Sequence, residues 1–150
     1  MVSFRGLVTR YGILVHAMKL DHLGVAVKSL EESLRFYRDV LGLAVACQEE
    51  VPAERVRLAM LPLGDTRVEL LEATSEESAI ARFVAKRGEG LHHIAVRVPD
   101  LNAAMARLTA AGSRLVNETP GVGAGGHRFV FVHPKSTGGV LLELVEDRDS

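Results

Sequence analysis

The sequence predicts an α+β fold made of two copies of a βαβββ module. A length of 150 residues with 47% hydrophobic side chains suits one compact domain with a substantial core. The strand that begins near His22 recurs near His93, and each half ends in an alternating apolar and glutamate strand, around Glu69 and around Glu143. A long repeat that occurs only twice favours a duplicated module over a solenoid, whose units are shorter and more numerous.

The first module is predicted over residues 19–73. An apolar, β-branched run at residues 20–27 is typical of a buried strand. Ser29 and Glu32 have the spacing of a helix capping box, and apolar residues then follow at helical spacing until Gly42, a typical C-terminal stop. Three short strands are expected next, at residues 43–50, 54–62 and 66–72.

A helix at residues 75–88 is predicted to connect this module to the second one, at residues 90–147. There the order begins again, with a strand at 91–98 and a helix at 101–111 capped by Asp100. Strands are expected near residues 114–117, 127–132 and 140–145. Residues 1–17 precede the first repeat and are interpreted as an N-terminal tail or start-site extension, with a targeting segment as the alternative, so that a single domain occupies residues 18–150.

Composition excludes several classes of partner. Eighteen basic and nineteen acidic residues give a net charge of -1, so there is no basic field for nucleic acid or for an anionic membrane. No apolar run approaches the roughly 18 residues that a membrane span needs. The single cysteine, Cys47, cannot form an internal disulfide, which favours a cytoplasmic location. Its apolar neighbours predict a buried thiol.

Four ionisable residues obey the repeat. His22 and His93 are 71 positions apart, and Glu69 and Glu143 are 74 apart, each glutamate lying between apolar residues of a strand. A carboxylate on a buried face is costly unless a cation compensates it. Two histidines and two glutamates therefore predict a divalent metal site with two nitrogen and two oxygen ligands. An iron site with two histidines and one carboxylate would use only one of the glutamates and is the alternative.

Two nearby features are ambiguous. His92 adjoins His93, but the register of Asp21 and His22 against this pair selects His93 as the ligand and leaves His92 in a supporting or structural role. The glycine-rich segment at residues 121–126 is followed by a strand, so it is not a nucleotide-binding fingerprint. It is either a hairpin connection or a loop that closes over a ligand, with four polar residues nearby: His127, Arg128, Lys135 and Ser136.

The stretches LDHLGVAV, GEGLHH and HPKS followed by GVLLEL resemble the vicinal oxygen chelate superfamily, which includes glyoxalases, bleomycin resistance proteins and dioxygenases. Within it the chain is similar to the methylmalonyl-CoA epimerase branch over about residues 19–146. The resemblance implies a mixed sheet curled around one divalent metal per chain, with cobalt expected and nickel, manganese or zinc possible. It also implies a homodimer and the same four ligands, His22, Glu69, His93 and Glu143.

The reaction that this resemblance implies is interconversion of (R)- and (S)-methylmalonyl-CoA, a CoA thioester, by removal of the C2 proton through a metal-chelated enolate. Inversion needs a base on each face of C2. The strand position where some members carry a second glutamate base is Leu58 here, so we expect Glu143 and Glu69 to act as the two bases. A glyoxalase I-like lactoylglutathione lyase, an extradiol-type dioxygenase and a metal-free ligand-binding module of the same fold are the alternatives.

Overall fold

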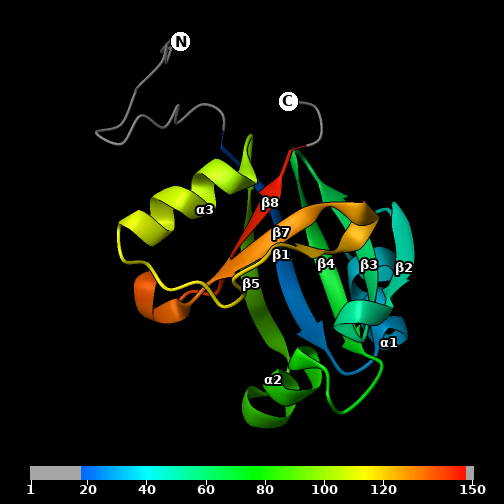
Figure 1. The fold of residues 1–150 in the computed structure, drawn as a ribbon. Coiled ribbons are helices and arrows are strands. Elements are labelled where there is room, and N and C mark those ends of the chain that lie inside the picture. Colours follow the sequence, from blue (N-terminus) through cyan, green and yellow to red (C-terminus); the bar gives the residue numbers. More distant parts are fainter. Residues whose placement is uncertain (1–17, 148–150) are drawn as a thin grey trace.

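The computed structural model describes residues 18–147, which form one eight-stranded mixed sheet in the order β2-β3-β4-β1-β5-β8-β7-β6 (Figure 1). The first module contains β1 (Lys19–Val27), α1 (Leu30–Leu34), the π-helix η2 (Arg35–Val40), β2 (Cys47–Val51), the 3-10 turn η3 (Pro52–Glu54), β3 (Val56–Leu63) and β4 (Thr66–Ala73). After α2 (Ala79–Arg87), the second module contains β5 (Gly90–Val98), α3 (Leu101–Ala110), β6 (Gly121–Val122), η4 (Ala124–Gly126), β7 (Arg128–Val132), η5 (Pro134–Ser136) and β8 (Leu142–Glu146).

The predicted α+β fold with a curled mixed sheet is confirmed. The domain boundary at residue 18 stays a prediction, because residues 1–17 lie outside the described part.

The two modules join edge to edge through their first strands. β1 and β5 pair antiparallel at the centre of the sheet, with Leu23 opposite Ile94. On the outer side of each, β1 pairs parallel with β4 and β5 pairs parallel with β8. This arrangement gives the sheet an approximate twofold symmetry, so residues related by the repeat occupy equivalent places on its two halves.

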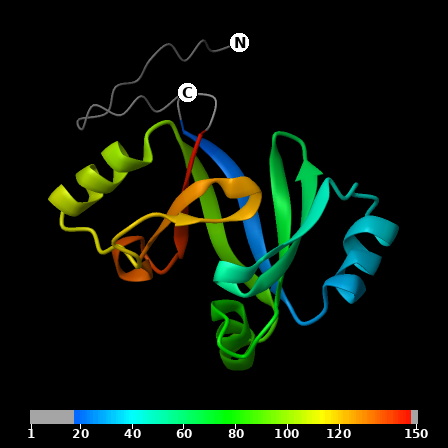
Figure 2. The same ribbon diagram turned by 45° about the vertical axis from the view of Figure 1, so that its right-hand side comes forward.

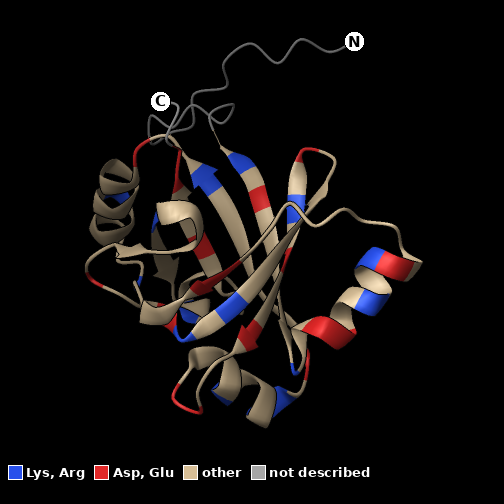
Figure 3. Cartoon of the chain, turned by 90° about the vertical axis from the view of Figure 1, so that its right-hand side faces the viewer, with Lys and Arg blue, Asp and Glu red and all other residues tan. Residues whose placement is uncertain are grey.

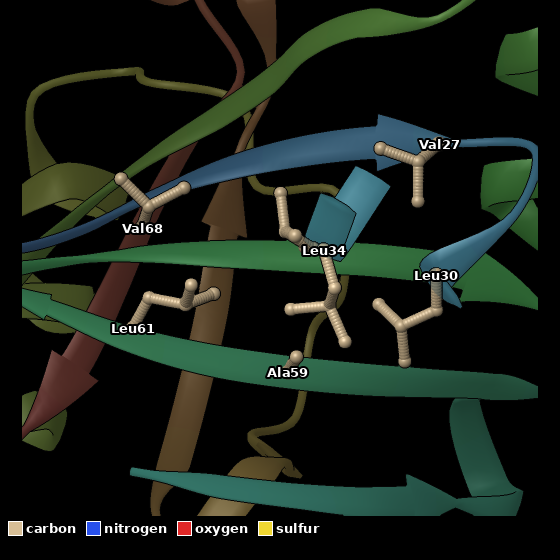
Figure 4. Packing of buried hydrophobic residues seen from close by; sticks show 7 residues of the cluster. Val27, Leu30, Leu34, Ala59, Leu61 and Val68 are labelled. Carbon is tan, nitrogen blue, oxygen red and sulfur yellow. The ribbon is translucent and has the colours of Figure 1, made fainter. Parts of the chain in front are cut away.

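The helices α1 and α3 cover the outer, convex side of the sheet. Figure 2 shows α1 and α3 on opposite flanks of the curved sheet and α2 at its lower end. Leu30 and Leu34 of α1 are buried against β1, β3 and β4, and Figure 4 shows this cluster. Each buried leucine contributes about 1.5–3 kcal/mol relative to an exposed one. Leu101 of α3 makes the equivalent contact on the second module. The concave face is thereby left for a cavity.

The outward carboxylates of β4 and β8 anchor these two helices. Glu72 Oε2 accepts a hydrogen bond from the Leu30 N–H at 2.8 Å, and Glu146 Oε1 accepts one from the Leu101 N–H at 3.3 Å. Both helices also have the predicted side-chain caps, at Ser29 and at Asp100. Glu72 and Glu146 therefore satisfy free N–H groups at helix starts, and the alternation of a strand leaves Glu69 and Glu143 on the opposite, inner face.

Two predicted elements differ from the structure. The helix predicted to Leu41 ends as a π-helix, in which the Leu41 N–H reaches the Phe36 carbonyl at 2.8 Å, and Tyr37 packs against the core. The strand predicted at residues 114–117 is only an isolated bridge between Leu115 and Val132. There the Asn117 side chain accepts the Phe131 N–H at 2.9 Å, in place of a backbone carbonyl.

Cys47 is exposed, and the predicted buried thiol is wrong. Among the strands of residues 18–147, β2 is an edge strand that pairs with β3 alone, and none of them lies beyond it. Figure 3 shows basic and acidic residues interspersed along the visible helices and strands, in keeping with the near-zero net charge. Within residues 18–147, no helix has both the length and the apolar character that crossing a membrane requires.

Candidate functional site

The concave face of the sheet encloses a cavity of about 370 Å³. Residues of both modules line it, and the lining includes all four predicted ligands. Apolar walls flank them, formed by Leu58 and Met60 of β3 and by Phe129 and Phe131 of β7. The cavity therefore combines a polar centre with apolar sides, a composition typical of small-molecule sites.

Strand register brings the four predicted ligands together. Gly24 of β1 pairs with Glu69 of β4, and Ala95 of β5 pairs with Glu143 of β8. His22 lies two residues before Gly24, and His93 lies two residues before Ala95. Because side chains alternate along a strand, each histidine points to the same face as the glutamate beside it. Each module thus contributes one histidine and one glutamate to the floor of the cavity.

The distances between these side chains are short. His22 Nε2 lies 3.1 Å from His93 Nε2, and Glu143 Oε2 lies 3.2 and 3.1 Å from the same two nitrogens. Glu69 oxygens lie 3.7 Å from His22 Nε2 and 3.9 Å from His93 Nε2. One ligand atom each of His22, Glu69 and His93 falls within 4.8 Å of the others, and Glu143 bridges both histidines although it lies outside that group of three.

This geometry fits a divalent ion. Bonds of about 2.1 Å at right angles place neighbouring ligand atoms about 3.0 Å apart. The three shortest contacts already have this spacing, and Glu69 needs a movement of less than about 1 Å to match it. All four side chains are buried, with exposed fractions of 9% or less. An octahedral ion held by His22, Glu69, His93 and Glu143 would keep two positions for other ligands.

These buried side chains shift one another's pKa values. Burial disfavours the charged form of His22, but its hydrogen bond to Asp21 and the charges of Glu143 and Glu69 outweigh burial and raise its pKa to about 10. Burial alone would raise the pKa of Glu143, yet hydrogen bonds from His22 and His93 lower it to about 2. Burial raises the pKa of Glu69. A cation would replace the proton on His22.

Two β-bulges place a supporting side chain behind each histidine. The pairing of β1 with β5 shifts between Leu20 and His22, and again opposite His92. A bulge turns two consecutive side chains towards one face. As a result, Asp21 Oδ2 lies 2.7 Å from His22 Nδ1, and His92 Nδ1 lies 2.9 Å from His93 Nδ1. Asp21 and His92 are 71 positions apart, so the support obeys the same repeat as the ligands.

The two supports differ in charge. Asp21 is buried, but hydrogen bonds from His22 and Arg97 and the charge of Arg67 keep its pKa well below the usual range. Burial and the neighbouring His93 lower the pKa of His92 to about 4, so it is neutral near pH 7. A neutral His92 can accept the Nδ1 proton of His93, which leaves His93 Nε2 free to bind a metal.

Gly24 makes room for the His93 ring. A Cβ atom at Gly24 would lie 2.1 Å from Cε1 of His93 and 2.5 Å from each of its ring nitrogens. Normal carbon contacts are about 3.5–4.0 Å. Only a residue without a side chain can therefore stand beneath this imidazole. Its repeat mate, Ala95, faces His22 across the sheet and is fully buried.

Two cavity residues were not singled out by the sequence. Glu49 and Glu54 line the cavity, and Asp21 was noted only for its register. Of the polar residues near the glycine-rich segment, only His127 is part of the cavity lining. Arg128, by contrast, pairs with Glu146 at 2.9 Å. The pairing of Glu49 across the β2–β3 hairpin would have identified it, but the sequence does not show that pairing.

The glycine-rich segment reaches the mouth of the cavity. Its η4 turn lines the cavity, and the Gly125 N–H donates a hydrogen bond to Glu49 Oε1 at 2.8 Å. This bond links the last hairpin of the second module to β2 of the first. Figure 2 shows the β6–β7 hairpin approaching η3 from the opposite side. The position of this segment at the cavity mouth is therefore compatible with the interpretation that it closes over a ligand.

A family model described as the Glyoxalase/Bleomycin resistance protein/Dioxygenase superfamily matches residues 21–131. The chain belongs to this superfamily. Within the superfamily, human mitochondrial methylmalonyl-CoA epimerase is 38% identical over 127 residues, which cover 84% of this chain and 72% of the human protein. The predicted resemblance to the superfamily and to its epimerase branch is confirmed.

Solved structures from the same superfamily agree. The crystal structure of methylmalonyl-CoA epimerase from Mycobacterium tuberculosis superposes with a TM-score of 0.81 and 41% identity, covering 85% of this chain and 86% of that one. A methylmalonyl-CoA epimerase in complex with methylmalonyl-CoA and NH4+ superposes with a TM-score of 0.82 and 38% identity, covering 88% and 96%. At these identities, the likeness extends beyond the fold to the sequence.

Proposed function

We propose that this protein is a metal-dependent epimerase that interconverts (R)- and (S)-methylmalonyl-CoA by proton transfer at C2. The observation that carries the proposal is the set of two histidines and two glutamates on the floor of the cavity, in a chain about 38% identical to methylmalonyl-CoA epimerases. Both glutamates contact the histidines, which favours this set over an iron site with a single carboxylate.

His22, Glu69, His93 and Glu143 would hold the ion, and cobalt is the expected metal, with nickel, manganese and zinc as the other candidates. When bound, the ion would act as a Lewis acid towards the two oxygens of the substrate that stand in 1,3-relation, the thioester carbonyl and the free carboxylate. The acidity of the C2 proton depends on this polarisation.

The other side chains of the cavity are assigned roles in excluding water and in transferring protons. Leu58, Met60 and Phe131 keep water away from the reacting carbon. Glu143, with an oxygen next to both histidines, lies where it can take the C2 proton from one face. For the opposite face the repeat predicts Glu69, and this role stays a prediction.

The CoA part of the substrate, the homodimer and the cytoplasmic location also belong to the proposal. The near-neutral surface and the absence of a long apolar helix in the described residues are compatible with them. A measurement of molar mass in solution tests the dimer.

The experiment that tests the function is turnover of (R)- or (S)-methylmalonyl-CoA by cobalt-reconstituted protein, coupled to methylmalonyl-CoA mutase. Epimerisation that disappears on chelation is the expected result. No turnover, together with conversion of the hemithioacetal of methylglyoxal and glutathione, would favour a lactoylglutathione lyase. Oxygen uptake that depends on Fe(II) would favour a dioxygenase.

A further inference from the structure

We propose that Glu49, on β2, is the second proton-transfer group and serves the face of C2 opposite to Glu143. The inference rests on the proposed function and names the residue that completes it. It replaces Glu69 in that role and leaves Glu69 as a metal ligand.

The first argument is the position of the two predicted glutamates. Glu69 and Glu143 both lie on the floor of the cavity, and both approach the same two histidine nitrogens. Two groups beside one ion reach a substrate bound to that ion from the same side. Epimerisation requires that a proton leave one face of C2 and that another arrive at the opposite face. The second group must therefore come from the mouth of the cavity.

The second argument is strand register. Glu49 pairs directly with Leu58 across the β2–β3 hairpin. Residues paired in this way project to the same face, with their Cβ atoms about 5 Å apart. Leu58 is 2% exposed and lines the cavity, and Glu49 lines it beside Leu58. A carboxylate is thus present one strand away from the position where leucine cannot transfer a proton.

The third argument is orientation. β2 and β6 are the two edges of the described sheet, and the bond from the Gly125 N–H to Glu49 Oε1 joins β2 to η4, the turn that follows β6, across the mouth. This bond fixes one oxygen of Glu49. No hydrogen bond of the other oxygen is found within residues 18–147, so Oε2 can face the cavity and the floor ligands below it.

The other ionisable residues of the cavity wall are less suited. Asp21 is bonded to His22 and to Arg67. His127 precedes β7, the neighbour of β8, and so stands on the same module as Glu143. Glu54 is exposed at the rim in η3. Glu49 alone among these combines a position on the first module, a register partner in the apolar wall and a bond that orients it.

The proposed step conserves atoms and electrons. The Glu49 carboxylate takes the C2 proton as the C–H bond breaks, and the electron pair moves into the thioester carbonyl. Glu143, in its acid form, then gives a proton to the opposite face of C2. In the reverse direction the two glutamates exchange roles, and their carboxyl protons equilibrate with water between turnovers.

The test measures deuterium uptake at C2 in D2O for each enantiomer separately, with Glu49→Gln and a matched control, Glu50→Gln. Glutamine can still accept the Gly125 N–H, so the loop contact is kept. Glu50 is the next residue on the same strand, exposed and outside the cavity lining. Metal content, substrate affinity and circular dichroism are measured for every variant.

In Glu49→Gln we expect interconversion to fall at least about 100-fold, because a positioned acid or base contributes about 10²–10⁴ in rate. One enantiomer should still take up deuterium without inversion, through Glu143, while the other stays inert. Metal content and substrate affinity should change less than twofold, and Glu50→Gln should behave as the unmodified protein.

Interconversion at the normal rate in Glu49→Gln would overturn the inference, and so would loss of exchange for both enantiomers. The same one-sided exchange in a metal-loaded Glu69→Gln variant, with normal Glu49→Gln, would assign the role to Glu69. If the unmodified, metal-loaded protein exchanges neither enantiomer, the proposed function itself fails.

Discussion

Replacing Gly24 with alanine tests whether His93 holds a metal from the position described. The backbone at Gly24 does not have a positive φ, so alanine can adopt it without strain. The added methyl group would lie 2.1 Å from His93 Cε1, against a normal contact of about 3.5–4.0 Å. The imidazole must therefore move by about 1.5 Å, or the strands must part.

A displacement of this size is several times the tolerance of a metal bond, which is about 0.2 Å. The two distances of 3.1 Å, from His93 Nε2 to His22 Nε2 and from His93 Nε2 to Glu143 Oε2, would both be lost. We expect metal affinity to fall at least about 100-fold, since a ligand is lost rather than reoriented. The cost in folding stability should be about 1–3 kcal/mol, typical of overpacking.

Isothermal titration with cobalt gives the affinity, and urea unfolding of the metal-free protein gives the stability. Ala95→Gly is the matched control, since it changes the repeat mate, which lies opposite His22, by the same methyl group but adds no atom against a ligand ring. It should lose at most about 1 kcal/mol of stability and keep its metal affinity. Normal cobalt binding by Gly24→Ala would refute the placement of His93 as a ligand.

Three further outcomes follow from the supporting residues and from the pKa shifts. Asp21→Asn should weaken cobalt binding about tenfold or more, because His22 Nδ1 loses its charged partner; titration of the folded variant checks this. His92→Phe keeps a ring beside His93 but removes the Nδ1 acceptor, and a loss of similar size is expected in the same titration. In metal-free protein the pKa of His22 is raised from 6.5 to about 10 and that of Glu143 is lowered from 4.5 to about 2. The stabilisation from His22 is complete below pH 6.5 and is lost as pH rises towards 10, and that from Glu143 is complete above pH 4.5 and is lost towards pH 2. Urea midpoints of chelator-treated protein should therefore peak near pH 5.5, and a flat profile between pH 5.5 and 9 would contradict the shift of His22.

The repeat made the metal site predictable. A constant offset of 71 between the first strands and of 74 between the last ones identifies equivalent residues without knowledge of their contacts. His22 and His93 then had to lie on equivalent strands, and Glu69 and Glu143 on their neighbours. Because the two halves pack with an approximate twofold symmetry, equivalent residues converge where the halves meet. The structure brings all four side chains together.

What the sequence did not show depends on register between strands. The bulges that turn Asp21 and His92 behind the ligands come from a shift in the pairing of β1 with β5, and no residue type marks that shift. The pairing of Glu49 with Leu58 depends on where the β2–β3 hairpin turns. A change of one residue there would send Glu49 to the outer face. The sequence around Leu58 therefore does not show that the Glu49 carboxylate lies beside it.

Charge balance explains how an anionic substrate can approach a floor that contains three carboxylates. Glu69 and Glu143 together balance a divalent ion. Asp21 supports His22 from behind, and Arg67, which also lines the cavity, lies 2.6 Å from Asp21 Oδ2. Arg67 thus compensates Asp21 at Oδ2, the oxygen that also contacts His22 Nδ1, and Arg97 compensates it at Oδ1, so Asp21 can strengthen His22 as a ligand without adding negative potential to the cavity. A carboxylate that enters to bind the ion then meets a floor whose charges are balanced, while Glu49 and Glu54 are further acidic residues of the cavity lining. Asp21 therefore contributes to metal affinity through His22, and its ion pairs with Arg67 and Arg97 offset its charge.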